Sequence, residues 1–330
     1  MHPHKPTVAT HLHALAEMRD VTRVAVAFGV FDGVHRGHRK ILENLAAAAR
    51  QTRAAAVAVS FQPHPRAVLT HEKAPLLLTR DGQRARLLVT YGADAVVMLP
   101  FTHALANLGP EEFLEEHLFS GPPVDTICVG TDWRFGRKGT GNVDRLKQVA
   151  KRYHANVLSI DPFTLYGKPV SSTRIRDALT QGRLHYAERL LGRPYAIEGP
   201  VVHGKGIGAK TLGCPTANVQ ADGMVLPPPG VYAVIAHIQE RPGKHYGAIA
   251  YIGRAPTINR GPKSAQTPCV ETHIFDFHGD LYERKLHVQF VTFIRADRTF
   301  ETVKALQRQM QADISKAKQV TRTRRRPRRT

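Results

Sequence analysis

The most restrictive feature of this sequence is a change in the pattern of its apolar segments near residue 192. Before that point, short runs rich in valine and alanine alternate with segments of helical spacing. After it, runs with a period near two follow one another, divided by glycine and proline. The first pattern is typical of a parallel α/β sheet, and the second is typical of an antiparallel barrel or sandwich. A chain of 330 residues is long enough to contain both.

We therefore predict an N-terminal α/β domain over residues 1–183 and a smaller antiparallel β domain, a barrel or a sandwich, over residues 184–314. A helix over residues 184–191 is expected at the junction, and another over residues 299–314 at the end of the second domain. The strands expected in the first domain are 21–28, 54–61, 94–99, 125–130 and 156–160. The helices expected between them are 36–52, 80–92, 110–119 and 142–153.

The formal net charge of +20 suits both polyphosphate ligands and nucleic acid. Residues 316–330 carry eight lysines or arginines and no acid, which leaves +12 on the rest of the chain. Like charges in a low-complexity segment repel one another. We therefore expect residues 315–330 to form a disordered basic tail.

The composition argues against several other classes of protein. No apolar run approaches the roughly 18–20 residues that span a membrane, and residues 1–15 lack the pattern of a secretory signal. Cys128, Cys214 and Cys269 lie far apart, without the CxxC spacing of a zinc site. We expect a cytoplasmic protein with a solvated N-terminus and no membrane partner.

The segment GVFDGVHRGH follows the first apolar run and leads into the helix expected over residues 36–52. Glycines there, such as Gly29 and Gly33, permit sharp turns and close approach of a ligand. The N–H groups and positive dipole end of a helix N-terminus favour phosphate. His35 and His38 can present two imidazoles to one anion. These features predict a phosphate site; zinc is disfavoured because no third ligand follows at the usual spacing.

Three further segments follow strands of the same predicted sheet, so we expect them at the same edge. FQPHPR places His64 between two prolines, and VGTDWRFGRKGTGN supplies Asp132. SSTRIR opens a helix with capping side chains, including Ser172 and Thr173, and places Arg176 in the first turn. A cation at a helix N-terminus opposes the dipole unless an anion binds there, so this segment also points to phosphate.

The C-terminal half has its own glycine-dense segment, GKGIGAKTLGCPTAN. It is not a P-loop, because alanine precedes the lysine and LGCPTAN cannot continue as the required helix. We expect a flap over phosphate followed by two neutral oxygen donors suited to a magnesium–nucleotide, although a plain turn would use the same residue types. The candidate residues are Gly204, Gly206, Lys210, Thr216 and Asn218.

Glu271 lies in the strand-like segment VETHIFDF. Strand alternation predicts that it shares a face with His273, Phe275 and Phe277. An acid on an aromatic face is costly to bury without a partner or a role. Glu271 is therefore a candidate catalytic group, with an internal salt bridge as the alternative.

Four motifs in order, GVFDGVHRGH, FQPHP, VGTDWRFG and SSTRIR, resemble the adenylyltransferase module of the bacterial bifunctional riboflavin kinase/FAD synthetase family. The resemblance covers nearly all of the first domain and implies a Rossmann-like nucleotidyltransferase that transfers AMP from ATP to FMN. It implies that His35 and His38 are catalytic and contact the ATP phosphates. It also implies that Ser172, Thr173 and Arg176 hold the leaving pyrophosphate. The other binding candidates on these motifs are Gly29, Phe31, Asp32, Gly33, His64 and Asp132.

The motifs LGCPTAN, LPPPGVYAV, GRAPT and VETHIFDFHGDLYERKLHVQFVTFIR resemble the riboflavin kinase module of the same family. This implies a barrel that phosphorylates the ribityl 5′-hydroxyl of riboflavin from ATP. Glu271 would be the general base, with Thr216 and Asn218 at magnesium and ATP. Departures from the family pattern, which bear on flavin affinity, occur in the RKGTG stretch and at Cys214, Tyr251 and Ala255.

The sequence thus predicts a bifunctional transferase that makes FMN and then FAD, with Mg²⁺ and with ATP as co-substrate at both sites. Its other ligands would be riboflavin, ADP and pyrophosphate, and it would be a monomer or a weak homo-oligomer. Two alternatives stay open: only one activity is retained, or the chain binds nucleic acid through its Arg-rich tail.

Overall fold

The computed structural model describes residues 6–18, 21–70, 74–203, 215–253 and 269–325. The chain forms two compact units, Met1–Pro75 with Thr79–Ser172 and Leu76–Leu78 with Thr173–Thr330. The division after Ser172 precedes the boundary expected at residue 183, because most of helix α8 (Ser172–Thr180) falls in the second unit. The short segment Leu76–Leu78 joins the second unit through a hydrogen bond from Leu77 N to Gly223 O of 2.7 Å.

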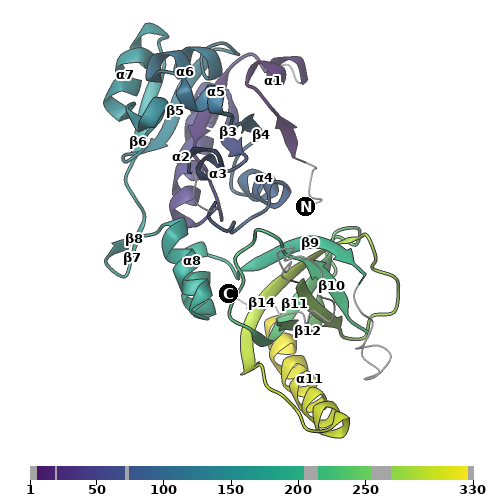
Figure 1. The fold of residues 1–330 in the computed structure, drawn as a ribbon. Coiled ribbons are helices and arrows are strands. Elements are labelled where there is room, and N and C mark those ends of the chain that lie inside the picture. The colour runs from purple at the N-terminus through teal and green to yellow at the C-terminus, as the bar shows by residue number, and fades with distance from the viewer. Residues whose placement is uncertain (1–5, 19–20, 71–73, 204–214, 254–268, 326–330) are drawn as a thin grey trace. The chain divides into compact units, whose positions relative to one another are not determined.

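The first unit contains a parallel sheet whose six described strands follow the order β1-β4-β3-β2-β5-β6 (Figure 1). These strands are β1 (Thr7–Ala9), β2 (Val24–Phe28), β3 (Ala55–Gln62), β4 (Ala95–Pro100), β5 (Val124–Gly130) and β6 (Asn156–Ile160). Every residue of β2 is buried, as expected for a central strand covered on both faces. The predicted parallel α/β sheet is confirmed.

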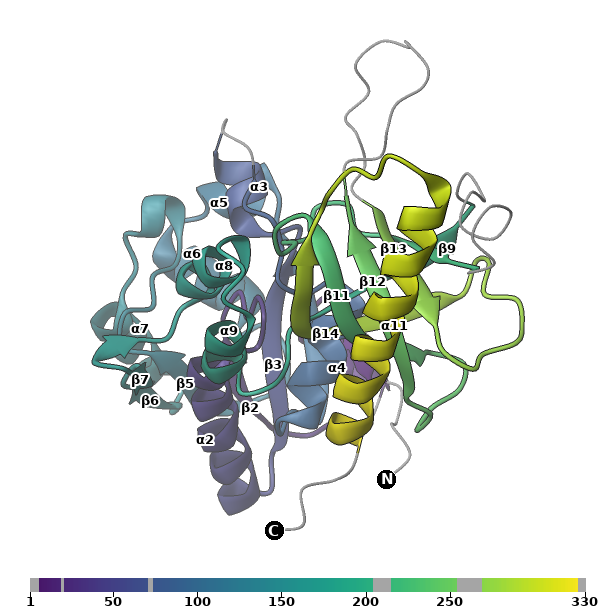
Figure 2. The same cartoon turned by 90° about the horizontal axis from the view of Figure 1, so that it is seen from below.

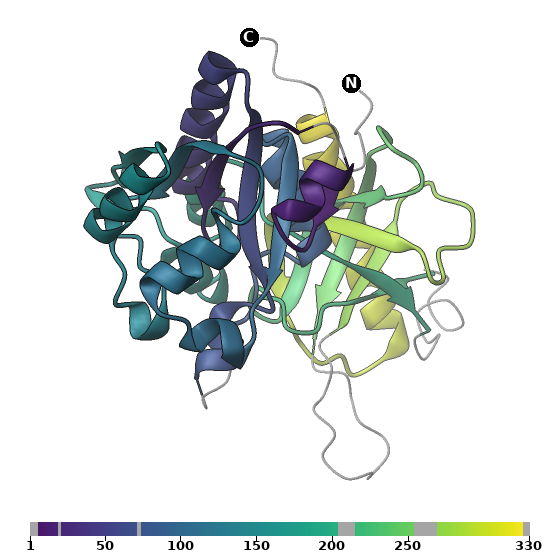
Figure 3. The same cartoon turned by 90° about the horizontal axis from the view of Figure 1, so that it is seen from above.

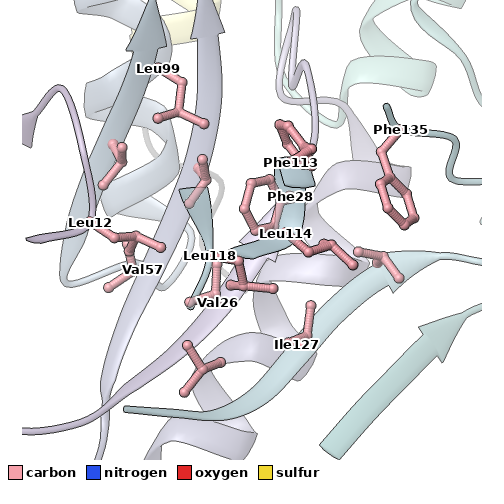
Figure 4. Packing of buried hydrophobic residues seen from close by; sticks show 14 of the residues in the cluster. Leu12, Val26, Phe28, Val57, Leu99, Phe113, Leu114, Leu118, Ile127 and Phe135 are labelled. Atoms are coloured by element: carbon pink, nitrogen blue, oxygen red, sulfur yellow. The ribbon is translucent and has the colours of Figure 1, made fainter. Parts of the chain in front are cut away.

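Helices cover both faces of this sheet. Val26 and Phe28 belong to one hydrophobic cluster with residues of α1, α6 and α7, among them Phe113 (Figure 4). Ala25 and Ala27 point to the other face and pack with residues of α2 and α4. Because side chains alternate along a strand, β2 contributes to both layers of the core. These helices are α1 (His13–Met18), α2 (Arg36–Thr52), α4 (Asp81–Thr90), α6 (Pro110–His117) and α7 (Val143–Arg152).

Shorter elements complete the unit. They are α3 (Pro65–Leu69), α5 (His103–Asn107), the 3₁₀ turn η1 (Arg137–Gly139) and the hairpin of β7 (Thr164–Leu165) and β8 (Lys168–Pro169).

The described part of the N-terminus is folded into the first unit, contrary to the expectation of a solvated arm. Strand β1 pairs in parallel with β4, with Thr7 opposite Ala95. Leu12 and Leu15 are buried in the core. A strand this short gives too little periodicity to be recognised in the sequence, but its place beside β4 adds backbone pairing and apolar burial.

The second unit is a closed antiparallel barrel in the order β10-β13-β12-β11-β14-β9, seen from another direction in Figure 3. Its described strands are β9 (Ala196–Val202), β10 (Ala217–Gln220), β11 (Gly230–Ile238), β12 (Tyr246–Ile252), β13 (Cys269–Ile274) and β14 (Lys285–Ala296). Val234, Ala248 and Phe290, which lie opposite one another on β11, β12 and β14, are buried. The predicted barrel is confirmed, and α9 (Leu184–Leu191) has the predicted bounds.

Helix α11 (Val303–Arg325) lies along β11, β12 and β14 of the barrel (Figure 2). It extends well past residue 314, so the expectation of a disordered tail from residue 315 is wrong as far as Arg325. Asp313, Ala317 and Thr321, spaced by four residues, form its buried face. Ala317 packs with Ala233 of the barrel, and this contact anchors a segment whose charges alone would favour disorder.

Replacing Ala317 with leucine should lower the free energy of unfolding by about 1–3 kcal/mol, because the site has no room for added methylenes. Ala312→Leu, on the exposed side of the same helix, is the matched control and should change stability by less than about 0.5 kcal/mol. Urea unfolding followed by circular dichroism measures both. Equal stability of the two variants would contradict a docked helix beyond residue 314.

Candidate active sites

In the described part of the first unit, the turn after β2 has three positive φ values within four residues. Phe31 and Val34 adopt φ values of 52° and 36°, and Gly33 lies between them at 82°. Positive φ is unfavourable for residues with a side chain, especially for β-branched valine. Strain of this kind costs about 1–3 kcal/mol per residue and persists where the surroundings enforce it, commonly at functional sites.

Asp32 fixes this turn from within. Its side chain is buried, and its Oδ1 accepts hydrogen bonds from Thr79 N at 3.0 Å and Thr79 Oγ1 at 3.1 Å. Thr79 Oγ1 in turn accepts from Gly33 N at 3.0 Å. Ser172 Oγ donates to the backbone oxygen of Asp32 at 2.9 Å. The network joins the predicted residues Asp32, Gly33 and Ser172, and it adds Thr79.

His35 and His38 are brought together at the start of α2. Their rings stack with centroids 3.6 Å apart, and the Phe31 and His38 rings meet edge to face with centroids 5.2 Å apart. His35 is the N-cap residue, and its Nδ1 accepts from His38 N at 3.3 Å. Because Nδ1 is an acceptor, the neutral His35 ring carries its proton on Nε2. The pair can therefore donate to an anion at a helix N-terminus.

Two glycines leave room for these rings. A Cβ at Gly29 would come within 2.9 Å of the Phe31 ring, and a Cβ at Gly37 would come within 3.1 Å of His35 Cε1. Both spacings are tighter than ordinary van der Waals contact. The glycine spacing in GVFDGVHRGH therefore matches the rings packed against it.

The neighbouring strands end at the same edge of the sheet. β2 lies between β3 and β5, and the chain reaches β5 only after forming β4, so the turn after β2 is at a topological switch point. His64 follows β3 as the N-cap of α3 and accepts from Arg66 N at 3.2 Å. Asp132 follows β5 and is exposed. Trp133 beside it stacks on Phe135 at 4.4 Å.

The motif SSTRIR is divided between the two units. Ser172 belongs to the first unit, whereas Thr173 and Arg176 belong to the second. Arg176 Nε donates to Leu76 O at 2.7 Å, and Arg174 Nε donates to Tyr186 Oη at 3.2 Å. These bonds give both arginine side chains partners within the second unit.

In the second unit, strand register places Glu271 between two polar side chains. Asn218 of β10 lies opposite Glu271 of β13, which lies opposite Tyr251 of β12. Val270 and Thr272, the neighbours of Glu271 in sequence, are buried. Glu271 therefore lies on the outer face of the barrel and reaches solvent, rather than sitting in an aromatic core. Partial burial of its carboxyl still raises the pKa of Glu271.

The same face supports the segment that precedes β10. His273 Nδ1 donates to Pro215 O at 2.8 Å, next to Thr216. Tyr251 Oη donates to Asp297 Oδ2 at 3.0 Å; burial and this bond raise the pKa of Tyr251 to about 12, so the phenol stays a donor. Phe275 shares the alternation of Glu271 but is covered by α11.

The oxygen donors at this face suit magnesium, which binds through one or two protein oxygens together with substrate phosphates. Thr216 and Asn218 can supply such oxygens. Among the described residues, no cluster of three or more His, Cys, Asp or Glu side chains could hold a metal without a substrate. Gly204, Gly206 and Lys210, with Cys214 and Ala255, lie outside the described residues.

Comparison with known proteins matches a family model to each unit. The FAD synthetase family model matches residues 17–174, and the riboflavin kinase family model matches residues 191–321. A Pseudomonas fluorescens protein named bifunctional riboflavin kinase/FMN adenylyltransferase is 37% identical over 308 residues, covering 93% of this chain and 96% of its own. Proteins of the same name from Bacillus subtilis and Escherichia coli K12 are 32% and 35% identical, over 93% and 87% of this chain and 95% and 90% of theirs.

This chain belongs to the bifunctional riboflavin kinase/FMN adenylyltransferase family. It contains both an FAD synthetase and a riboflavin kinase domain, so the predicted family and the predicted class of transferase are confirmed. Family membership implies ATP as the co-substrate. A solved Streptococcus pneumoniae structure described as a macrolide-efflux protein shares the fold, with a TM-score of 0.78 and 28% identity over 95% of this chain and 99% of the other.

No helix in the described part of the chain is both long and apolar enough to cross a membrane.

The structure also reveals two residues of the FAD synthetase domain that the sequence did not single out. Thr79 lies 46 residues from Gly33, whose N–H donates a hydrogen bond to it. Arg84 lies 54 residues from Val30, whose carbonyl oxygen accepts a hydrogen bond from it. Neither belongs to a glycine- or histidine-bearing motif. The sequence predicts a helix over residues 80–92 that contains Arg84, but its pattern does not indicate that the Arg84 side chain is buried.

Thr79→Val should lower stability by about 1–3 kcal/mol, because it removes one donor to buried Asp32 and the acceptor for Gly33 N while nearly keeping the volume. Thr90→Val, at an exposed position on α4, is the control and should have little effect. Thermal unfolding of each variant measures the difference. If both variants unfolded at the wild-type temperature, the Asp32 network would not be what holds the turn.

Proposed function

We propose that the second unit phosphorylates riboflavin to FMN and that the first unit then adenylylates FMN to FAD, with magnesium–ATP in both steps. The main support is that each matched domain has its own constellation of phosphate-directed groups. One is the stacked His35–His38 pair at a helix N-terminus, and the other is the row of Asn218 and Glu271 across paired strands. The two constellations share no residue.

In the kinase reaction, Glu271 accepts the proton of the ribityl 5′-hydroxyl as its oxygen attacks the γ-phosphorus of ATP, and ADP leaves. The raised pKa of Glu271 suits a base that must take up a proton near neutral pH. Thr216 and Asn218 hold magnesium, which neutralises charge on the phosphates. Gly204, Gly206 and Lys210 are proposed to cover the nucleotide.

In the adenylylation reaction, a phosphate oxygen of FMN attacks the α-phosphorus of ATP, and pyrophosphate leaves. No protein nucleophile is needed, so the work of the site is positioning and charge stabilisation. His35 and His38 donate to the phosphate oxygens as charge develops on them. Gly29, Phe31, Asp32, Gly33, His64 and Asp132 form the nucleotide and flavin site, and Ser172, Thr173 and Arg176 hold the pyrophosphate.

We place the protein in the cytoplasm as a monomer or a weak homo-oligomer. The described cysteine side chain, Cys128, is buried and free, and burial raises the pKa of its thiol to about 12. Such a thiol is unreactive and suits a reducing compartment.

A time course with riboflavin, ATP and magnesium tests the whole proposal. Chromatography of the flavins should show FMN first and FAD later. FMN that accumulates without FAD would limit the protein to the kinase activity. Absence of any product from riboflavin and from added FMN would refute both assignments.

Two substitutions should separate the reactions. Glu271→Gln should lower riboflavin phosphorylation by about 10²–10⁴-fold by removing the base, while conversion of FMN to FAD stays near wild type. His38→Ala should lower adenylylation by about 10²–10³-fold and spare the kinase. Initial rates with riboflavin or FMN as substrate measure each activity.

Glu301→Gln and His103→Ala are the matched controls, since both side chains are exposed on the corresponding unit. Neither control should change either rate by more than about twofold. A folded Glu271 or His38 variant that lost both activities equally would contradict the division of labour.

A further inference from the structure

Arg84 is a buried cation at the carboxyl ends of β3 and β4. Only 1% of its side chain is exposed. Its Nη2 donates to Phe61 O at 2.9 Å and to Asp81 Oδ1 at 2.6 Å, and it contacts Met98 Sδ at 3.7 Å. Phe61 is near the end of β3, three residues before His64.

The same guanidinium reaches the turn after β2. Arg84 Nη1 donates to Val30 O at 3.4 Å, and Ser60 Oγ donates to the same oxygen at 2.9 Å. Val30 directly precedes Phe31, where the left-handed backbone of the histidine turn begins. One side chain from α4 therefore contacts the turn that carries His35 and His38 and the end of the strand that leads to His64.

Burying the charged side chain of Arg84 costs free energy that a residue with a purely space-filling role would not cost. Burial lowers the pKa of its guanidinium, and the charges of Asp81 and Asp32 act in the opposite direction. Within the described residues, its buried Nε has no hydrogen-bond partner. An apolar side chain of similar volume would avoid both penalties. What arginine alone supplies is a planar set of donors that can hold several acceptors in fixed directions.

We propose that Arg84 is a positioning residue for adenylylation: it ties the turn after β2 to the end of β3 and so fixes His35 and His38 relative to His64, which follows that strand. The inference rests on the assignment of adenylylation to the first unit. It deepens that assignment by adding a residue that acts on the histidines through backbone carbonyls.

The proposal predicts that Arg84→Met lowers kcat for FMN adenylylation by about 10–100-fold, because a displacement of about 1 Å at reacting groups can cost 100-fold in rate. KM for ATP should change much less, since the groups that bind the nucleotide remain. Arg84→Lys keeps the charge but can hold fewer carbonyls, so its kcat should lie between those of Arg84→Met and the wild type.

Leu88→Ala is the matched control, because Leu88 is fully buried on the same helix and its truncation destabilises the unit without touching either turn. Steady-state rates are measured on full-length proteins well below their unfolding temperatures. Only the Arg84 variants should lose kcat, and riboflavin phosphorylation by every protein should match the wild type. A wild-type kcat in folded Arg84→Met, or an equal loss in Leu88→Ala, would overturn the proposal.

If Arg84→Met does not fold, Asp81→Asn carries the test, because Asp81 is partly exposed and its charge helps to hold the guanidinium. A several-fold loss of kcat is then expected, and an unchanged kcat would overturn the proposal. A wild-type protein that cannot adenylylate FMN would instead refute the proposed function. The two failures are therefore distinguishable.

Discussion

The first unit depends on a left-handed backbone that its surroundings must impose. Phe31 and Val34 have positive φ, and neither has the glycine freedom that would make this cheap. The buried hydrogen bonds of Asp32 hold the turn in this shape and connect it to Thr79. The strained backbone has a structural consequence: the chain enters α2 with His35 at the N-cap and with His38 stacked on it. Amide groups and imidazoles then converge at the start of α2.

The second unit organises polar groups by a different constraint, the register of a closed barrel. Once β10, β13 and β12 are paired, Asn218, Glu271 and Tyr251 must lie side by side on the outer face, because cross-strand partners are only about 5 Å apart. Their inward neighbours fill the barrel and fix that register. The positions of the catalytic candidates are therefore a by-product of core packing, and no strained turn is needed among the described residues to create them.

Local patterns in the sequence predicted much of this arrangement. Helix α2 has the predicted bounds because its apolar period and its glycine-rich start agree. Helix α11 was predicted too short because its buried face after residue 312 consists of Asp313, Ala317 and Thr321, which form no apolar stripe, while its arginines favour disorder. Thr79 and Arg84 escaped notice for another reason. Their contacts join segments some fifty residues apart, and only the folded sheet brings those segments together.

The two proposed sites also differ in how they handle protons, and this explains which carboxylate can act as a base. A ribityl hydroxyl must lose its proton to attack phosphorus, so the kinase site needs an accessible carboxylate, and Glu271 reaches solvent. The phosphate of FMN is already an anionic nucleophile at neutral pH and needs no base. Asp32 is the acid nearest in sequence to the histidine pair, yet it is buried and its Oδ1 accepts two hydrogen bonds from Thr79. Its carboxylate shapes the turn, and the reaction is left to groups that donate to phosphate.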